Sequence, residues 1–327
     1  MAIKLNKPYK SILLPYQNEK AIKYVRDTFT ELLFEKMWYL TRTSAPLFIE
    51  SGKCVNDDLA NTCNPVSFNI GDKSVEMLHS LAKWKRLKLK DFNMCRYFGI
   101  YTNMNAIRKD EELDNLHSVY VDQWDWEIVI SKSDRTIQCL KDHVSDIYHC
   151  IRLTESKLCD KFQYIKPFLP KDITFFNLND LKSEYPNKTQ QEIEKIVCEK
   201  YGAVFIIGMD NTCGRASDYD DWKLNGDLLI WSNVLDIPIE ITSMGIRVDK
   251  NSLKEQLSIC NEQYKEEFEY HKMVLNDELP LTIGGGIGQS RLCMLLLQKA
   301  HIGEVQCSVW DDKTINYANE NNIKLLK

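Results

Sequence analysis

The chain has 327 residues, of which 44% are hydrophobic, so it can bury a sizeable core as one large domain or two small ones. Its net charge of −5 gives no overall basic surface of the kind that binds nucleic acid. No run of 18 apolar residues predicts a membrane-spanning helix, and residues 1–8 lack the apolar centre of a secretory leader, so we expect a cytoplasmic protein with no membrane partner.

Eleven cysteines are scattered along the chain without a Cys-x-x-Cys pair. This spacing favours neither a zinc site nor a disulfide framework. We therefore expect reduced cysteines that lie in the core.

Apolar residues recur three or four positions apart between residues 19 and 40, which predicts a helix with a broad apolar face. These residues are Ala21, Ile22, Val25, Phe29, Leu32, Leu33 and Leu40. Pro46 follows, and because proline cannot donate a ladder hydrogen bond, it suits the end of a strand at a sheet edge or an interface. An ordinary turn at Pro46 fits the local residues equally well.

Residues 51–74 are polar and rich in turn formers, and they contain Asp57 and Asp58, an acid pair of a kind that surface loops carry routinely. Residues 83–90 then mix lysine and arginine with apolar side chains. Such a run could bind phosphate or nucleic acid, but it is also typical of a solvated face. We favour the solvated face for the run as a whole, with Lys85 excepted.

The segment 119–127 alternates in a way that predicts a strand with two different faces. One face carries Val119, Val121, Gln123, Asp125 and Glu127, and the other carries Tyr120, Asp122, Trp124 and Trp126. The large aromatic residues imply that the strand lies deep in a sheet. Polar residues in series would be unusual in a core, so we interpret their face as the floor of a pocket.

The later part of the chain alternates between helical and strand-like patterns. The segments with helical periodicity are 136–162, 190–201 and 251–274, and the strand-like segments are 203–208, 227–234 and 237–248. Residues 209–225 form a polar stretch with Arg215 and Asp220 that suits a cover over a site as well as an idle surface loop. Together these elements predict an α+β fold, in which helices flank a mixed, mostly antiparallel sheet.

Residues 282–291 place four glycines within five positions, just ahead of an apolar run. Without Cβ atoms, this backbone can be approached closely by a flat or charged ligand. Arg291, where a helix begins, could stack on a purine or bind phosphate. A nucleotide site is one interpretation and an ordinary glycine-rich turn is the other, because the spacing matches neither a P-loop nor a dinucleotide fingerprint.

The Arg108 segment, the acidic turn after it and the return strand resemble motif 2 of the class II aminoacyl-tRNA synthetase core, and the glycine-rich strand ending in Arg291 resembles motif 3. The early helix leading to Pro46 resembles motif 1, which forms the dimer interface in that family. More specifically, the chain is similar, nearly end to end, to the ammonia-dependent asparagine synthetases, or aspartate–ammonia ligases. The segments that carry this likeness are 79–86, 117–127, 219–222, 224–227, 243–249 and 282–291.

The resemblance implies ATP-dependent amidation of L-aspartate by ammonia through a β-aspartyl adenylate, with release of AMP and diphosphate. It also implies a homodimer, built from a single catalytic domain over residues 1–327 without an anticodon-binding domain.

On the nucleotide side, the resemblance implies that Arg108 holds the α-phosphate and that Arg291 contacts adenine and the terminal phosphates. Asp227 and Glu240 are the implied ligands of Mg²⁺, an ion for which hard carboxylates are suitable. The further implied nucleotide ligands are Arg215, Asp220, Gly284, Gly286 and Gly288.

On the aspartate side, groups of opposite charge are needed. The resemblance assigns the substrate ammonium to Asp57, Gln123 and Asp125. It assigns the two substrate carboxylates to Lys85, Ser243 and Arg247. The residues expected to take part in catalysis are Arg108, Lys85, Asp125 and Arg291.

Two other hypotheses compete with this one, a tRNA-charging enzyme and a catalytically silent paralogue. A tRNA-charging enzyme would need an anticodon-reading domain, for which the segments before residue 19 and after Arg291 leave little room. A catalytically silent paralogue would be expected to lose charged ligands, which are retained here. A glutamine-dependent synthetase is also disfavoured, because it needs an N-terminal cysteine nucleophile and residue 2 is Ala2.

Overall fold

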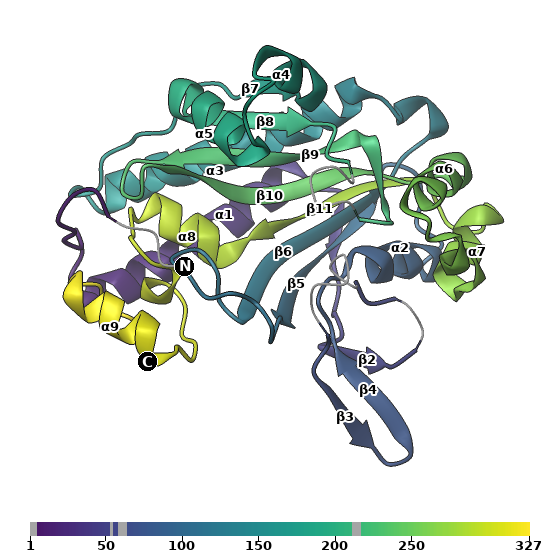
Figure 1. Cartoon of the computed structure of the whole chain (residues 1–327), viewed down its shortest axis with the longest axis horizontal. Coiled ribbons are helices and arrows are strands. Elements are labelled where there is room, and N and C mark those ends of the chain that lie inside the picture. The colour runs from purple at the N-terminus through teal and green to yellow at the C-terminus, as the bar shows by residue number, and fades with distance from the viewer. Residues whose placement is uncertain (1–4, 53–54, 58–63, 211–216) are drawn as a thin grey trace.

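The computed structural model describes residues 5–52, 55–57, 64–210 and 217–327. An eight-stranded sheet crosses this part of the molecule in the order β1-β5-β6-β11-β10-β9-β8-β7 (Figure 1). Its strands are β1 (Leu40–Arg42), β5 (Gly99–Ile107), β6 (Tyr120–Val129), β7 (Thr174–Asn177), β8 (Ala203–Ile207), β9 (Asp220–Ser232), β10 (Ile237–Arg247) and β11 (Thr282–Gly288). β1 pairs in parallel with β5, as β7 does with β8, and the other five pairings are antiparallel. The predicted α+β class with a mostly antiparallel mixed sheet is confirmed.

Helices flank this sheet. They are α1 (Pro15–Lys36), α2 (Ala82–Asp91), α3 (Ile137–Lys161), α4 (Leu178–Glu184), α5 (Gln190–Tyr201), α6 (Lys250–Cys260), α7 (Glu269–Leu275), α8 (Gln289–Leu296) and α9 (Asp312–Glu320), with 3₁₀ turns η2 (Lys132–Asp134), η4 (Gln263–Glu267) and η5 (Ile302–Glu304). Local sequence signals determine where some of these helices begin. Pro15 occupies the first turn of α1, where its missing N–H is not needed. Thr136 caps α3, and its Oγ1 accepts the N–H of Cys139 at 3.1 Å.

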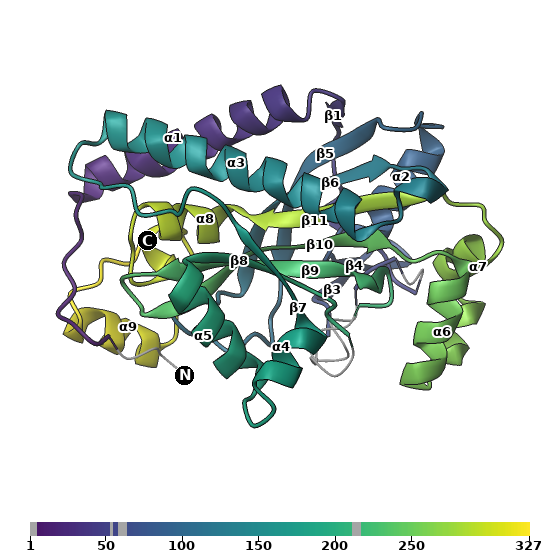
Figure 2. The same cartoon turned by 90° about the horizontal axis from the view of Figure 1, so that it is seen from above.

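α1 and α3 lie side by side over one face of the sheet (Figure 2). Trp124 and Trp126 of β6 are buried in the same core as the apolar faces of these two helices. Since side chains alternate along a strand, Gln123, Asp125 and Glu127 lie on the opposite face. The predicted division of this strand into an aromatic face and a polar face is therefore confirmed.

β8 is apolar throughout because it is covered on both faces. Phe205 and Ile207 belong to the core beneath α1 and α3, whereas Val204 and Ile206 pack with α4 and α5. Burial on both sides explains why this segment reads as a continuous apolar run without alternation.

Antiparallel register brings polar residues of the central strands into one row. Asp125 of β6 is opposite Gly286 of β11, Gly286 is opposite Ser243 of β10, and Ser243 is opposite Asp227 of β9. These residues are far apart in the sequence, and strand pairing alone places them side by side. The row lies on the sheet face opposite α1 and α3.

Two predicted segments have different bounds in the structure. The helix expected over 251–274 is interrupted, because α6 ends at Cys260 and Asn261 adopts the left-handed conformation with φ 57°. The polar stretch expected to last until residue 225 ends earlier, since β9 begins at Asp220 and pairs with Arg247 of β10 past a register shift.

The polar region around residues 51–74 contains a second sheet that was not predicted. β2 (Phe48–Glu50), β3 (Ser67–Ile70) and β4 (Lys73–Met77) form three antiparallel strands that project from the body of the fold (Figure 1). β3 alternates polar and apolar residues, but over only four positions, and all four are exposed, so the pattern is a weak signal for a strand.

The expectation that residues 83–90 form a solvated face was also wrong for most of the run. Lys83 and Arg86 are buried along with Lys85. Arg86 donates to two backbone carbonyls, those of Pro280 at 2.9 Å and Val248 at 2.8 Å. Buried cations with partners of this kind cannot be distinguished from surface lysines by composition alone.

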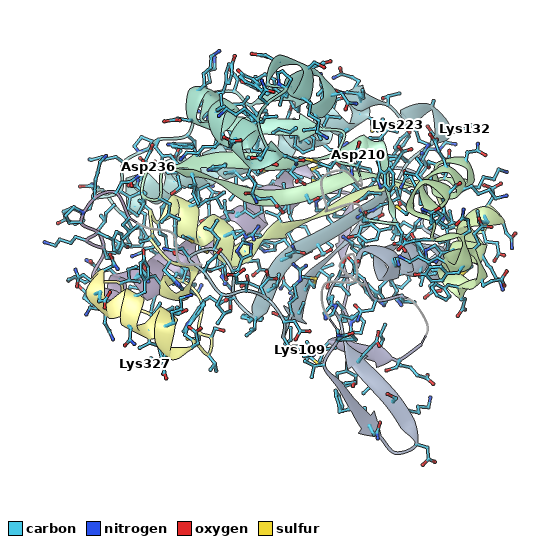
Figure 3. The ribbon with its side chains drawn as sticks, in the orientation of Figure 1. Lys109, Lys132, Asp210, Lys223, Asp236 and Lys327 are labelled. Atoms are coloured by element: carbon cyan, nitrogen blue, oxygen red, sulfur yellow. The ribbon has the colours of Figure 1, made fainter. Side chains whose placement is uncertain are left out.

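Other charged side chains lie on the outside of the fold, as Figure 3 shows for Lys109, Lys223 and Lys327. In the part of the chain that the structure describes, no helix is long and apolar enough to cross a membrane.

The cysteines were expected to be core residues, and this is correct for Cys150, Cys198 and Cys293. Cys95 and Cys307 are exposed, and Cys139, Cys159 and Cys260 are partly buried, so the expectation was too general.

Candidate active site

A cavity of about 440 Å³ lies over the polar row of the sheet. It is lined by most of the residues expected to form the site. These are Asp57, Lys85, Arg108, Gln123, Asp125, Asp220, Asp227, Glu240, Ser243, Arg247, Gly286, Gly288 and Arg291. Gly284 does not line the cavity, and Arg215 lies outside the described residues.

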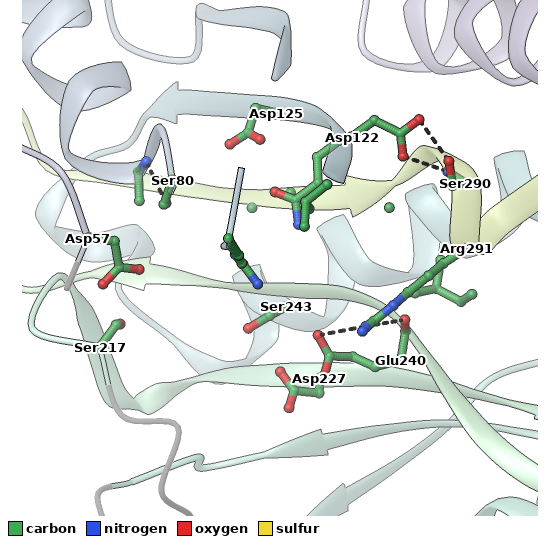
Figure 4. Close-up of a pocket in the computed structure, with 18 of the residues that line it drawn as sticks. Asp57, Ser80, Asp122, Asp125, Ser217, Asp227, Glu240, Ser243, Ser290 and Arg291 are labelled. Atoms are coloured by element: carbon green, nitrogen blue, oxygen red, sulfur yellow. Dashed lines mark hydrogen bonds and ion pairs between the residues drawn. The ribbon is translucent and has the colours of Figure 1, made fainter. Parts of the chain in front are cut away.

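The residues are spread along the cavity, as Figure 4 shows. Asp57 and Ser217 lie at one end, and Arg291 and Glu240 lie at the other. Asp125 and Ser243, from the polar row, lie between them. The expected aspartate and nucleotide ligands therefore share one continuous space.

Lys85 reaches the floor of the cavity from α2 and is almost fully buried. Its Nζ forms an ion pair with Asp125 and donates to the carbonyl oxygens of Trp126 at 3.1 Å and Gly285 at 3.0 Å. These contacts occupy all three of its N–H groups. The other carboxylate oxygen of Asp125, Oδ2, is buried without a hydrogen-bond partner among the described residues.

Arg247 forms the second cationic centre. It donates to Glu127 from Nε at 2.9 Å and from Nη2 at 2.7 Å, and its Nη1 is bonded to Asp220. Its guanidinium also lies 5.4 Å from the centre of the Tyr219 ring. Since a guanidinium has five N–H groups, two are left for other acceptors in the described part of the site.

Burial and the charge of Arg247 shift the pKa values of its two carboxyl partners, Asp220 and Glu127, in opposite directions. Burial raises the pKa of Asp220 above its usual value, and Glu127 adds to this, although Arg247 opposes it. Burial would also raise the pKa of Glu127, but Arg247, Lys85 and a hydrogen bond from Thr282 outweigh it and hold the pKa below its usual value. If all are ionised, this buried group has two cations, Lys85 and Arg247, and three carboxylates, those of Asp125, Glu127 and Asp220. Its net charge of −1 would be balanced by one cationic ligand group.

The glycines of β11 leave room for side chains of β6. A Cβ atom at Gly284 would lie 2.0 Å from Oε2 of Glu127, and one at Gly286 would lie 2.4 Å from Oε1 of Gln123. Both distances are far below van der Waals contact. At these two positions, the close approach that glycine permits is made by side chains of β6, of which Gln123 lines the cavity and Glu127 does not.

Arg108 follows the last residue of β5, where the hairpin to β6 begins. Its N–H donates to the carbonyl of Val119 at 2.8 Å, and its Nη2 donates to the carbonyl of His79 at 3.4 Å. The buried Nε of Arg108 has no hydrogen-bond partner among the described residues. The side chain thus has donor capacity left for an anion in the cavity.

At the far end of the cavity, Nη1 of Arg291 donates to the carbonyl oxygen of Glu240 at 3.2 Å and lies 3.7 Å from its carboxylate (Figure 4). Asp227 lines the cavity on the neighbouring strand. The described residues contain no cluster of three or more His, Cys, Asp or Glu arranged to hold a metal alone. Two carboxylates suit Mg²⁺, which commonly takes its remaining ligands from water and substrate phosphates.

Some functional candidates were not assigned a role from the sequence. Glu127 was placed on the polar face of its strand by alternation, but its pairing with Arg247 across 120 residues could not be inferred. Tyr219, whose hydroxyl donates to Asp57 at 3.0 Å, gave no signal beyond lying in one of the matching segments. Asp122 was placed on the aromatic face of β6, with no role.

Comparison with known proteins agrees with the resemblance. A family model described as aspartate-ammonia ligase matches residues 16–322. The aspartate–ammonia ligase of Clostridium perfringens strain SM101 is 48% identical over 330 aligned positions, which cover 98% of each chain. That of Lactiplantibacillus plantarum is 48% identical over 320 positions, covering 95% of this chain and 99% of the relative.

Among solved structures, the chain resembles two asparaginyl-tRNA synthetases determined with asparaginyl-adenylate. The protein from Entamoeba histolytica has a TM-score of 0.68 and 12% identity, and the likeness covers 90% of this chain and 69% of that one. The protein from Pyrococcus horikoshii has a TM-score of 0.67 and 13% identity, with 89% and 68% covered. At such low identity the likeness shows a shared fold, that of class II synthetases. The family match over nearly the whole length is more specific, and the chain belongs to the aspartate–ammonia ligase family.

Proposed function

We propose that this protein amidates L-aspartate with ammonia, using ATP and passing through a β-aspartyl adenylate. The observation that supports this best is the single cavity, which has a buried cluster of paired charges at its floor and Arg291 with two carboxylates at its far end. An adenylate-forming enzyme needs its amino acid and its nucleotide in one space, because the carboxylate must reach the α-phosphorus.

For aspartate, we propose that the substrate ammonium binds Oδ2 of Asp125, with Gln123 and Asp57 as further acceptors. A buried carboxylate oxygen without a partner is costly, and a substrate ammonium bound to it would remove that cost.

For the two substrate carboxylates, we propose Arg247, Lys85 and Ser243. Arg247 has N–H groups left to donate, whereas Lys85 would act through its charge or by exchanging one of its present acceptors. Asp220 lies beside Arg247, so we propose that it orients this guanidinium in addition to completing the site.

For the nucleotide, we propose that Arg108 contacts the α-phosphate and that Arg291 contacts adenine and the terminal phosphates. Asp227 and Glu240 would hold Mg²⁺, which when bound neutralises charge between phosphate oxygens. Gly286 and Gly288 would contribute backbone at the cavity wall. Arg215 stays a proposed ligand.

The reaction then has two steps. A β-carboxylate oxygen of aspartate forms a bond to the α-phosphorus while the bond to diphosphate breaks. Arg108 would stabilise the charge that develops on the phosphorus oxygens. Ammonia, formed from ammonium by loss of a proton, then attacks the β-carbonyl carbon, its nitrogen loses a second proton to solvent, and AMP leaves with the oxygen that came from aspartate.

We also retain a homodimer, a single catalytic domain and a cytoplasmic location as predictions. For the dimer, support comes from Trp38, which lies between α1 and β1 in the motif 1 region. Its side chain is 72% exposed and its ring centre lies 6.0 Å from that of Phe98. Exposed aromatic pairs of this kind are common in interfaces between proteins.

The proposed function is tested by incubating the purified protein with ATP, Mg²⁺, aspartate and ammonium. We expect AMP and asparagine in equal amounts, and we expect that glutamine will not replace ammonium efficiently. Formation of ADP in place of AMP would exclude the adenylate mechanism.

A further inference from the structure

The first turn of α8, which carries Arg291, has no capping side chain of its own, because its N-cap residue is Gly288. A carboxylate from β6 takes this role. Oδ1 of Asp122 accepts the backbone N–H of Ser290 at 2.9 Å, and Oδ2 accepts the Ser290 hydroxyl at 2.8 Å (Figure 4). Asp122 is buried, so these bonds are shielded from water. The start of α8 is thus fixed by a residue from another element.

The Asp122 carboxylate is in turn held by α1. Nη2 of Arg26 donates to Oδ2 of Asp122 at 2.7 Å and to the hydroxyl of Ser290 at 3.3 Å. Asp122 and Ser290 line the cavity, whereas Arg26 does not. Arg26 therefore contacts the cap of α8 from behind the cavity wall.

We propose that Arg26 is a positioning residue for the nucleotide end of the site. It holds Asp122, Asp122 holds the first turn of α8, and that turn sets where the Arg291 side chain begins. The proposal deepens the proposed function, on which its link to ATP rests. Arg26 itself does not line the cavity and touches no substrate.

The negative charge of Asp122 is a second reason for its pairing with Arg26. Asp122 is a carboxylate in the wall of a cavity that is proposed to accept a polyphosphate, and an unpaired carboxylate would repel it. Arg26 compensates this charge from outside the cavity. Loss of Arg26 would thus weaken nucleotide binding through both the geometry of Arg291 and the charge of Asp122.

The aspartate end is held by different contacts. Lys85 is bonded to Asp125 and to the backbone of β6 and β11, and Arg247 is bonded to Glu127. None of these contacts involves Arg26, Asp122 or Ser290. A change at Arg26 is therefore expected to act on ATP and not on aspartate.

The test compares Arg26→Gln, Arg26→Lys and a matched control, Lys23→Gln. Lys23 lies on the same helix and pairs with Asp27 on the exposed surface. Amide hydrogen exchange is measured without substrates. We expect exchange of the first turn of α8 to be about fivefold faster or more in Arg26→Gln, and unchanged in the control.

Steady-state kinetics supply the second measurement. In Arg26→Gln we expect the KM for ATP to rise about tenfold and the KM for aspartate to change less than about twofold. Arg26→Lys keeps the charge and has three N–H donors in place of five, so we expect it to restore most of the loss. If Arg26→Gln does not fold, Asp122→Asn is expected to give the same faster exchange in α8.

Unchanged exchange of α8 in Arg26→Gln would overturn the proposal, as would an equal rise in both KM values. Because the exchange measurement uses no substrate, it is independent of the reaction. A wild-type protein that forms no AMP would count against the proposed function, and exchange in α8 would still decide whether Arg26 holds the helix.

Discussion

Arg247 donates two hydrogen bonds to Glu127, one from Nε at 2.9 Å and one from Nη2 at 2.7 Å, and both side chains are almost completely buried. The pair joins β10 to β6 beneath the cavity, although 120 residues separate the two positions. Gly284 lies between these strands and leaves the space that the Glu127 carboxylate occupies.

Replacing Glu127 by glutamine keeps the size of the side chain and removes its charge. Arg247 would then retain only the carboxylate of Asp220 as a charged partner among its present contacts. Breaking a buried pair typically costs about 3 kcal/mol or more, so we expect a loss of this size in the free energy of unfolding, measured with urea. The control is Glu255→Gln, which breaks an exposed pair with Lys223 and is expected to cost less than about 1 kcal/mol. Equal losses in the two variants would contradict this.

His301 predicts a dependence of stability on pH. Burial lowers the pKa of His301 to about 4, although Asp114 partly opposes this, and its Nδ1 accepts the N–H of Gly303 at 3.0 Å, which requires an unprotonated nitrogen. In the unfolded chain the pKa is about 6.5, so between about pH 6.5 and pH 4 the unfolded state binds more protons. Stability therefore falls as the pH falls through this window, by roughly 3 kcal/mol from this residue.

This is checked by measuring the free energy of unfolding at intervals from pH 7 to pH 4 for the wild type and His301→Asn. We expect the variant to lose less stability over the window than the wild type does. His149→Asn is the control, because His149 is exposed. If the wild type and His301→Asn showed the same slope, His301 would not be the residue that titrates.

Arg108→Lys keeps a positive charge but loses the fork geometry of the guanidinium. Contacts to charge that develops in a transition state typically contribute about 3 to 4 kcal/mol, so we expect kcat to fall by about two to three orders of magnitude with the fold unchanged. Arg96→Lys is the control, because Arg96 is exposed. A loss of less than about threefold would show that Arg108 does not touch the reacting phosphate.

Asp125→Asn keeps the shape of the side chain, but it removes both the proposed partner of the substrate ammonium and the charged partner of the buried Lys85. A charge-assisted hydrogen bond contributes about 1.5 to 3 kcal/mol, so the dissociation constant for aspartate is expected to rise by about one to two orders of magnitude. Calorimetry with ATP should show little change. Unchanged aspartate binding would mean that Asp125 does not face the substrate, and equal loss of both ligands would indicate misfolding.

Some of this architecture could be predicted from the sequence. The period of two along β6 placed Gln123 and Asp125 on the face opposite Trp124 and Trp126, because side chains must alternate along a strand. The helices α1, α3 and α5 were also recognised, since each has one clear apolar face or a capping residue.

The pairings between distant residues could not be predicted in this way. Nothing near Asp122 in the sequence indicates that it caps α8, and nothing near Lys83 or Arg86 indicates that they are buried. These facts depend on which strands and helices become neighbours in three dimensions. The register of β6, β11, β10 and β9 was likewise needed to bring Asp125, Ser243 and Asp227 into one row.

In the proposed reaction, the β-carboxylate of aspartate attacks the α-phosphorus of ATP. This attack can be followed with aspartate labelled with ¹⁸O in both β-carboxylate oxygens, by mass spectrometry of the nucleotide and the diphosphate after complete reaction with ammonium. We predict that the AMP phosphate gains one labelled oxygen, that the asparagine amide keeps the other, and that the diphosphate is unlabelled. Labelled phosphate or diphosphate with unlabelled AMP would contradict the adenylate and the assignment of Arg108 to the α-phosphate.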